Sequence, residues 1–279
     1  LNPVEQNNGS KLVVCEQVAS SKYAALFEEV WGAGALDCSS VVEKMYDQVG
    51  LSIAAYEGSG EVNQFSSKYD AFLAGNAELS DEEARGLKLF TGKGKCADCH
   101  PVGAASAFTD FTYDNLGTPR NPENPFYDMD KELLDDGTPI NPEGRSWIDP
   151  GLGGFLKTRG ESSERVTENM GKHRVPTLRN VAKGPARAYM HNGYFKSLKS
   201  VVHFYNTRDL KPKCSNHLTI ERDALKMNCW PAAEVNENVN MEELGNLEMN
   251  DAEEDAIVAF MKALSDGYEV EKDVEEEAK

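Results

Sequence analysis

The sequence Cys96-Ala97-Asp98-Cys99-His100 constrains this 279-residue chain more than any other feature, and the pattern occurs once. Two cysteines that are separated by two residues and followed directly by a histidine can hold a haem covalently. The two sulfurs add to the vinyl groups of the haem, and His100 then lies beneath the iron as an axial ligand. The pattern therefore predicts one covalently bound haem c, attached through Cys96 and Cys99.

A C-x-x-C pair also occurs in zinc sites and in redox-active dithiols. A zinc site needs further cysteines or histidines at ligand spacing, and the other histidines form no tight pair in the sequence: His173, His191, His203 and His217. A thioredoxin-like dithiol needs a strand–helix–strand context, which the sequence lacks. Haem binding accounts for the motif best.

The sixth position of the iron is either filled by a side chain or open. Methionine is a neutral thioether ligand that favours ferrous iron and so raises the reduction potential. Met190 lies in a turn-prone stretch, residues 188–193, whereas Met45 and Met261 lie on apolar helical faces that are typical of a core. We therefore predict Met190 as the sixth ligand and metal-binding residue, with His191 or an open position as alternatives.

The formal net charge of −18 argues against a nucleic-acid partner, because phosphates need a basic surface. The charge suits either a basic protein partner, attracted at long range, or simple solvation of the surface. No apolar run approaches the roughly 18 residues that a membrane-spanning helix needs. We expect neither nucleic-acid binding nor a spanning segment.

Four further cysteines allow three disulfide pairings: Cys15, Cys38, Cys214 and Cys229. Pairing each with its nearest neighbour closes the shortest loops, and the 214–229 loop would then contribute about 3 kcal/mol by the chain-entropy estimate. Disulfides and covalent haem both favour an oxidising compartment, such as a bacterial periplasm. Four unrelated buried thiols in a cytosolic protein are the alternative.

Apolar residues recur at helical spacing in several segments, which predicts an all-α fold. Ser80 and Glu83 form a capping box, and Asn250 caps a later helix. Two stretches rich in turn residues, 109–160 and 207–246, predict long loops of the kind that cover functional sites or bind partners. The acidic tail from Glu269 predicts disorder. The predicted helices cover residues 11–31, about 40–56, 62–74, 80–92, about 197–206 and 250–264.

Four segments of the sequence resemble those of one family. They read GLKLFTGKGKCADCH, FTDFTYDNLG, VPTLRNVAKGPARAYMHNGYFKSLKSVVHFYN and EEDAIVAFMKALSDGY. In this order they resemble the C-terminal half of the bacterial di-haem cytochrome c peroxidases, a family that also includes the methylamine-utilisation di-haem enzymes. The resemblance runs along most of residues 1–268.

The resemblance implies two cytochrome c-like domains. In the family, an N-terminal haem meets peroxide, and a C-terminal His/Met haem of high potential receives electrons from a small donor such as a cytochrome c or a cupredoxin. The C-terminal haem would map to Cys96, Cys99 and His100, with Met190 as the methionine of the YMH sequence. The methylamine branch has a tyrosine at this position, so Met190 places the chain with the peroxidases.

The opening LNPVE resembles the family segment that lies over the peroxidatic haem. Its glutamate helps to move a proton as the O–O bond breaks, and this catalytic residue would map to Glu5. Gln6 stands where the family often has methionine. The first haem motif would then precede Leu1, which predicts either a fragment of a longer protein or a second polypeptide that holds the other haem.

The resemblance also implies a domain plan. Residues 1–78 would be the helical remnant of the peroxidatic domain, and residues 79–268 a C-terminal cytochrome c domain with the loop insertions. The acidic tail, 269–279, would follow. Family members are often dimers and bind Ca²⁺ between their domains, which here points to the stretch before Val175.

Three aromatic residues, Phe108, Phe111 and Tyr189, are candidates for haem-pocket walls or for the ordinary core. Arg179 would bind a haem propionate or a carbonyl, or serve structure alone. The expected function is relay of electrons to a peroxidatic haem that reduces hydrogen peroxide to water. The alternative is a mono-haem periplasmic cytochrome c that carries electrons without catalysis of its own.

Overall fold

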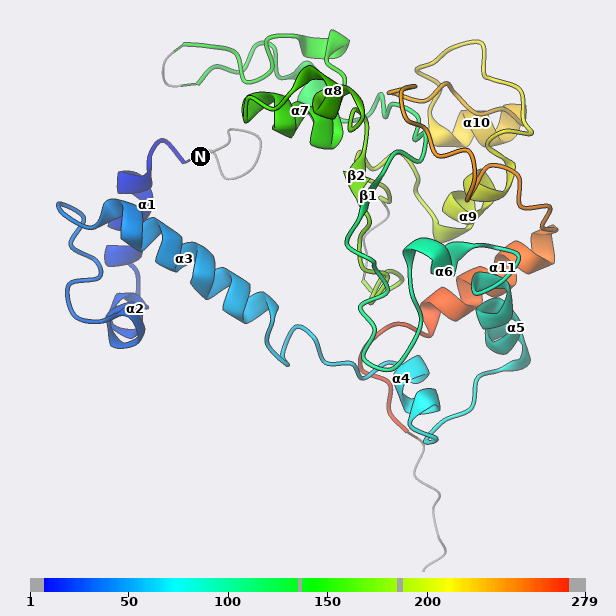
Figure 1. Cartoon of the computed structure of the whole chain (residues 1–279), viewed down its shortest axis with the longest axis horizontal. Helices are drawn as coiled ribbons and strands as arrows, with labels where there is room; N and C mark the ends of the chain where they lie inside the picture. Colours follow the sequence, from blue (N-terminus) through cyan, green and yellow to red (C-terminus); the bar gives the residue numbers. More distant parts are fainter. Residues whose placement is uncertain (1–7, 135–136, 185–187, 271–279) are drawn as a thin grey trace, which may run out of the picture. The chain divides into compact units, whose positions relative to one another are not determined.

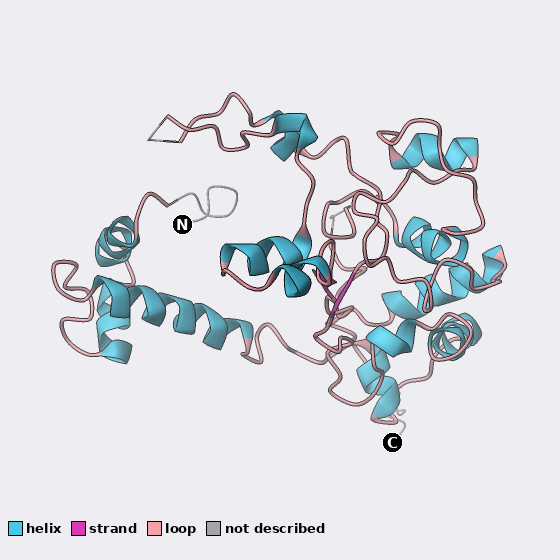
Figure 2. Ribbon diagram, turned by 45° about the horizontal axis from the view of Figure 1, so that its top comes forward, coloured by secondary structure: helices cyan, strands magenta, loops and turns pink. Residues whose placement is uncertain are grey.

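The computed structural model describes residues 8–134, 137–184 and 188–270 (Figure 1). These residues form helices joined by long loops, with one two-stranded antiparallel sheet of β1 (Tyr113–Asp114) and β2 (His173–Arg174) (Figure 2). None of the described helices combines the length and the apolar character that crossing a membrane requires. Most of the predicted acidic tail, residues 271–279, lies outside the described residues.

Contacts divide the chain into two compact units. The first comprises Leu1–Gln64 with Pro125–Trp147, and the second comprises Phe65–Asn124 with Ile148–Lys279. The domain limits expected from the resemblance, after residues 78 and 268, stay a prediction.

The described part of the first unit contains three α-helices with a small core between them. They are α1 (Lys11–Ala19), α2 (Ala24–Trp31) and α3 (Val42–Glu57), and two 3₁₀ turns, η1 (Pro125–Asp128) and η2 (Gly144–Ser146), belong to the same unit. Cys15, Phe27 and Met45 are buried together. The disulfide between Cys15 and Cys38 joins α1 to the segment before α3, as the short-loop pairing predicts.

The prediction of one helix over residues 11–31 is wrong, because the helix ends after Ala19 and a second begins at Ala24. The hydroxyl of Ser20 donates to the carbonyl of Gln17, at 3.1 Å, and that of Ser21 donates to Val18, at 2.7 Å. Serine hydroxyls that bind nearby carbonyls compete with helical hydrogen bonds. The apolar spacing continues across this break, so it conceals the turn.

The helix predicted over residues 62–74 is shorter than expected and is α4 (Lys68–Leu73). Ser67 begins it with a capping box that Asp70 closes. Phe65 has a positive φ of 48°, in the left-handed region that helices do not use. The cap and this residue together set the later start.

The second unit is organised around α5 (Asp81–Phe90) and α11 (Asp251–Lys262), which pack against each other (Figure 1). Both begin with the predicted caps, Ser80 and Asn250, in complete capping boxes. A Cβ at Gly86 would lie 2.0 Å from the carbonyl oxygen of Ala256, so the crossing needs glycine at this position. Phe90, Phe108 and Phe260 fill the core beside the crossing.

Helix α9 (Leu198–Thr207) packs against α11 and matches its prediction closely. The loops predicted at 109–160 and 207–246 are wrong in part, since they include α7 (Gly151–Thr158) and α10 (Glu221–Met227). α8 (Ser163–Thr167) packs beside α7. Glycines lower the helix propensity of α7, but Gly153 and Gly154 let it pack closely against Met170 and Pro150. The disulfide Cys214–Cys229 closes the segment around α10.

Candidate haem site

A cavity of about 430 Å³ lies within the second unit. Its walls include all four side chains predicted to hold a haem, namely Cys96, Cys99, His100 and Met190. Helices α9 and α11 supply an apolar lining, and a cavity of this size and character is typical of a cofactor site. The apolar lining comes from Val201 and Val202 of α9 and from Ile257 and Met261 of α11.

The two cysteines lie on the single helical turn α6 (Cys96–Cys99). A Cβ on Gly94 would lie 2.9 Å from the side chain of Ile257, so a glycine brings this turn close to α11. Both thiols are free of disulfides, and burial raises the pKa of each to about 12. Such protonated thiols do not suit a redox dithiol, which needs a thiolate. They suit thioether attachment.

His100 is oriented by the backbone. Its Nδ1 lies 2.7 Å from the carbonyl oxygen of Phe108, which assigns the ring proton to Nδ1 and leaves Nε2 as the free ligand atom. Burial lowers the pKa of His100, although the hydrogen bond to Phe108 opposes this shift. The ring is therefore neutral and ready to bind a metal at Nε2.

Met190 is presented by a tight turn. Its φ is +68°, in the left-handed region that a non-glycine residue rarely adopts. The flanking Tyr189 N–H donates to the carbonyl of Phe195, at 2.8 Å, and Gly193 N–H donates to the carbonyl of Met190, at 3.3 Å. The Tyr205 hydroxyl lies 3.7 Å from the Met190 sulfur and donates to it. The turn thus fixes the thioether at the cavity wall.

His191, the alternative ligand, also lines the cavity but is engaged by another ring. It stacks on His173 with ring centroids 3.5 Å apart and planes 6° from parallel. Burial and the neighbouring His191 lower the pKa of His173 to about 4, so its ring is neutral. Nitrogen lone pairs lie in the ring planes, so two parallel rings cannot direct them at one ion. Asp149 beside the pair therefore does not complete a metal site in this arrangement.

Two carboxylates lie near Cys99, and no pattern in the sequence indicates that they do. Oxygens of Asp114 and Glu243 lie with the Cys99 sulfur in a cluster no wider than 4.8 Å. The Asn240 amide donates to Asp114, at 2.7 Å, and to Glu243, at 2.5 Å. These residues meet only in the folded chain, and they place negative charge at the cavity wall beside Cys99.

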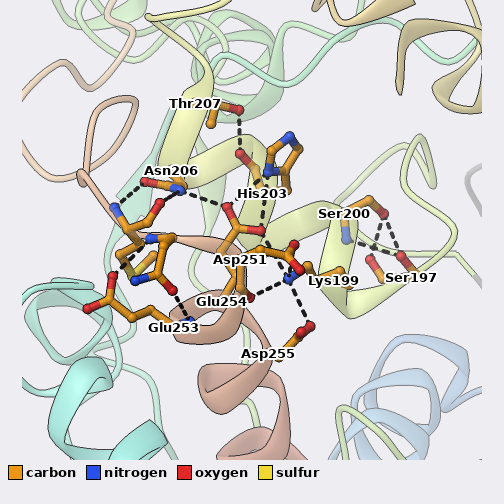
Figure 3. Close-up of polar contacts among 12 residues, drawn as sticks. Ser197, Lys199, Ser200, His203, Asn206, Thr207, Asp251, Glu253, Glu254 and Asp255 are labelled. Carbon is orange, nitrogen blue, oxygen red and sulfur yellow. Dashed lines mark hydrogen bonds and ion pairs between the residues drawn. The ribbon is translucent and has the colours of Figure 1, made fainter. Parts of the chain in front are cut away.

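A polar network fixes α9 to α11, the two helices that form the apolar wall (Figure 3). The Glu254 side chain is 2% exposed and accepts hydrogen bonds from His203 Nδ1, at 2.9 Å, and from Asn206 Nδ2, at 2.7 Å. Lys199 Nζ forms an ion pair with the same carboxylate at 3.3 Å. These contacts hold the helices in one relative position beside the cavity.

The remaining predicted residues are placed in different ways. Glu5 lies outside the described residues. Arg179 binds the carbonyl of Ser106, at 2.6 Å, and a carboxylate of α4, which is a structural role. Tyr189 lines the cavity, whereas Phe108 belongs to the buried core. The expectation of a wall position is wrong for Phe111, whose side chain is 57% exposed.

Residues 1–78 match the family model described as di-haem cytochrome c peroxidase. The chain is 31% identical to the methylamine utilization protein MauG of Paracoccus denitrificans (strain Pd 1222), in an alignment that covers 95% of this chain and 63% of MauG. It is 33% identical to the cytochrome-c peroxidase IdrP1 of Denitromonas iodatirespirans, over 66% of this chain and 45% of IdrP1.

The structure is similar to that of the diheme peroxidase BthA from Burkholderia thailandensis E264, with a TM-score of 0.68 and 29% sequence identity. That superposition covers 95% of this chain and 61% of BthA. The chain thus spans about three fifths of the length of MauG and of BthA. In sequence and in structure, the chain is therefore similar to di-haem cytochrome c peroxidases and to MauG.

Proposed function

We propose that this chain holds one haem c through Cys96, Cys99, His100 and Met190, as an electron-entry centre. The haem would accept single electrons from a small redox protein and relay them to a second, peroxidatic haem that reduces hydrogen peroxide to water. The observation that carries the proposal is the single cavity whose wall includes both cysteines, the imidazole and the thioether.

Each side chain has a distinct part in this proposal. The thiols of Cys96 and Cys99 anchor the group, His100 offers Nε2 and Met190 offers its sulfur. The bound haem supplies an iron that changes its charge by one electron. Because two protein ligands would fill both axial positions, the site favours electron transfer over binding of peroxide.

The peroxide chemistry is proposed for the complete assembly. Reduction of one peroxide to two waters consumes two electrons and two protons, and Glu5 would carry a proton at the peroxidatic haem. This sequence has one C-x-x-C-H pattern, so the second haem would be bound by residues other than these. Relatives that are named peroxidases support this direction of electron flow.

A periplasmic location is proposed on two grounds. The structure contains two disulfides, and covalent haem and disulfides both suit an oxidising compartment.

The net charge of −18 favours a basic electron donor, whether a cytochrome c or a cupredoxin. A Ca²⁺ ion and a homodimer stay expectations from the resemblance.

The test begins with the intact mass and the haem content of the native gene product. The protein with its full haem complement is then mixed with a reduced small cytochrome, and peroxide-dependent oxidation of that cytochrome is followed. The expected result is rapid oxidation that Glu5→Gln slows by about 10²–10⁴-fold, the usual contribution of a general acid or base. Gln6→Glu, with Glu5 retained, is the control for charge at this segment. No oxidation by a two-haem protein would refute the peroxidase proposal.

The second candidate is a mono-haem electron carrier, and the paired His100 and Met190 ligands favour it for the chain by itself. A native product of this length with one haem, reversible reduction and no peroxide-dependent turnover would establish the carrier. A two-haem product with turnover would establish the peroxidase.

A further inference from the structure

We infer that Tyr205 tunes the reduction potential of the haem by donating a hydrogen bond to the sulfur of Met190. The tyrosine hydroxyl lies 3.7 Å from that sulfur, within the range for a hydrogen bond to sulfur. The inference goes beyond the ligand set and rests on the proposed ligation by Met190. It assigns Tyr205 a positioning and tuning role for the electron-entry centre.

The position of Tyr205 is fixed by contacts of its own carbonyl and of the residue that follows it. Its carbonyl accepts a hydrogen bond from Gly245 N–H at 2.5 Å. The next residue, Asn206, exchanges two hydrogen bonds with the backbone of Met249, at 2.8 and 3.0 Å, and also binds Glu254. The helical turn that carries the phenol therefore cannot rotate away from the sulfur without breaking buried hydrogen bonds.

The phenol is in the right state to donate. A tyrosine hydroxyl carries its proton at neutral pH and can donate it to an acceptor. Its partner is equally fixed, because the turn that presents Met190 is tied at Tyr189 and Gly193. Donor and acceptor thus face each other from two independently anchored segments, and both line the cavity.

The effect on potential follows from the electronic demand of the ligand. A hydrogen bond to the thioether sulfur draws electron density from it and makes it a poorer donor to iron. Ferric iron needs that density more than ferrous iron does, so the hydrogen bond favours the ferrous state. Hydrogen bonds to axial ligands are a recognised means by which proteins set haem potentials.

The test is the midpoint potential of the haem-loaded full-length protein carrying Tyr205→Phe. We expect the potential to fall, with roughly a threefold shift of the equilibrium toward ferric iron, or about 30 mV, because a tenfold shift corresponds to about 59 mV for one electron. The far-red sulfur-to-iron absorption band should persist, which would show that Met190 still binds the iron.

The control is Tyr194→Phe. Tyr194 is 1% exposed, and its hydroxyl donates to the carbonyl of Thr219 at 2.9 Å, away from the cavity lining. Removing this hydroxyl should lower stability and leave the potential unchanged. An equal fall of potential in both variants would refute a specific role for Tyr205.

Two other results would overturn the inference. One refutes only the tuning role, and the other also refutes ligation by Met190. If the wild-type protein shows the far-red band but Tyr205→Phe has an unchanged potential, the tuning role fails while the ligand proposal stands. If the wild-type protein lacks the band, ligation by Met190 fails and the tuning role fails with it.

Discussion

Asp70 and Arg179 lie far apart in the sequence, yet they meet through two parallel hydrogen bonds of 2.8 and 2.9 Å. The side chains are 13% and 6% exposed, so the pair is largely removed from water. The guanidinium also lies 4.1 Å from the ring centre of Phe65. The pair connects α4 to the VPTLRN segment, and its loss leaves a buried charge without its partner.

Asp70→Asn should therefore lower the free energy of unfolding by about 3–5 kcal/mol at neutral pH, the usual cost of breaking a buried ion pair. Arg179→Lys should also destabilise, because lysine keeps the charge but cannot form the two-pronged contact. Denaturant unfolding followed by circular dichroism measures both. If Asp70→Asn were as stable as the wild-type protein, the ion pair would contribute nothing to the free energy of unfolding.

The same pair predicts how stability depends on pH. Burial alone would raise the pKa of Asp70, but hydrogen bonds from Arg179 and Ser67 outweigh it and hold the pKa below its usual 3.8. A carboxyl with a lower pKa in the folded state contributes its full stabilisation above the unfolded pKa and loses it as pH falls through the folded pKa. Wild-type stability should thus fall below about pH 4, and Asp70→Asn should fall less steeply there. Parallel pH profiles for the two proteins would contradict this.

Met190→Ala should abolish the far-red band and open one axial position of the iron. Imidazole or cyanide should then bind readily, which absorption spectroscopy detects. Met261→Leu is the matched control, because Met261 also lines the cavity and leucine nearly conserves its volume. Persistence of the band in Met190→Ala, or its loss in Met261→Leu, would show that the ligand assignment is wrong.

Glu254→Gln should destabilise the second unit by about 2–3 kcal/mol. The neutral amide cannot replace the charged hydrogen bonds that the buried carboxylate forms with His203 and Lys199. Asp255→Asn is the control. Asp255 pairs with the same Lys199 at 2.8 Å, but its side chain is 51% exposed, so its loss should cost less than about 1 kcal/mol. Thermal unfolding of the two variants should separate these roles, and equal losses would contradict the difference in burial.

Replacing Cys214 and Cys229 together by serine should lower the free energy of unfolding by about 3 kcal/mol, from the loop that a sequence separation of 15 residues closes. The equivalent double change at Cys15 and Cys38 removes the disulfide of the first unit, which does not contain the cavity. That second variant should keep its haem absorption spectrum. A changed spectrum would show that the cavity depends on the first unit.

Local chemistry made much of this fold predictable from the sequence. The haem motif, the Ser80 capping box and the Asn250 cap each lie within a few residues, and the structure contains the latter two in the predicted form. The helical spacing of apolar residues located α9 and α11, because that pattern also lies within one short segment. It failed at Ser20, where the apolar spacing continues through a turn that serine hydroxyls create.

The parts of the site that escaped prediction depend on distant contacts. Asn240 joins Asp114 and Glu243 only because a loop more than a hundred residues later returns to β1. Tyr205 lies in a helix that the sequence predicts, but nothing in its neighbours indicates that its hydroxyl meets the Met190 sulfur. The side chain of Phe111 is exposed, and its backbone has a φ of +62°, a conformation that the sequence did not reveal.

If the haem is bound as proposed, the carbonyl of Phe108 behind His100 and the turn at Met190 would have a shared consequence for the speed of electron exchange. Both candidate ligands are held by backbone contacts rather than by the metal, so their positions are set before the iron changes its charge. A coordination sphere that keeps its shape in both oxidation states demands little movement of nuclei for each electron. The fold would thereby lower the reorganisation energy of the centre, independently of its driving force.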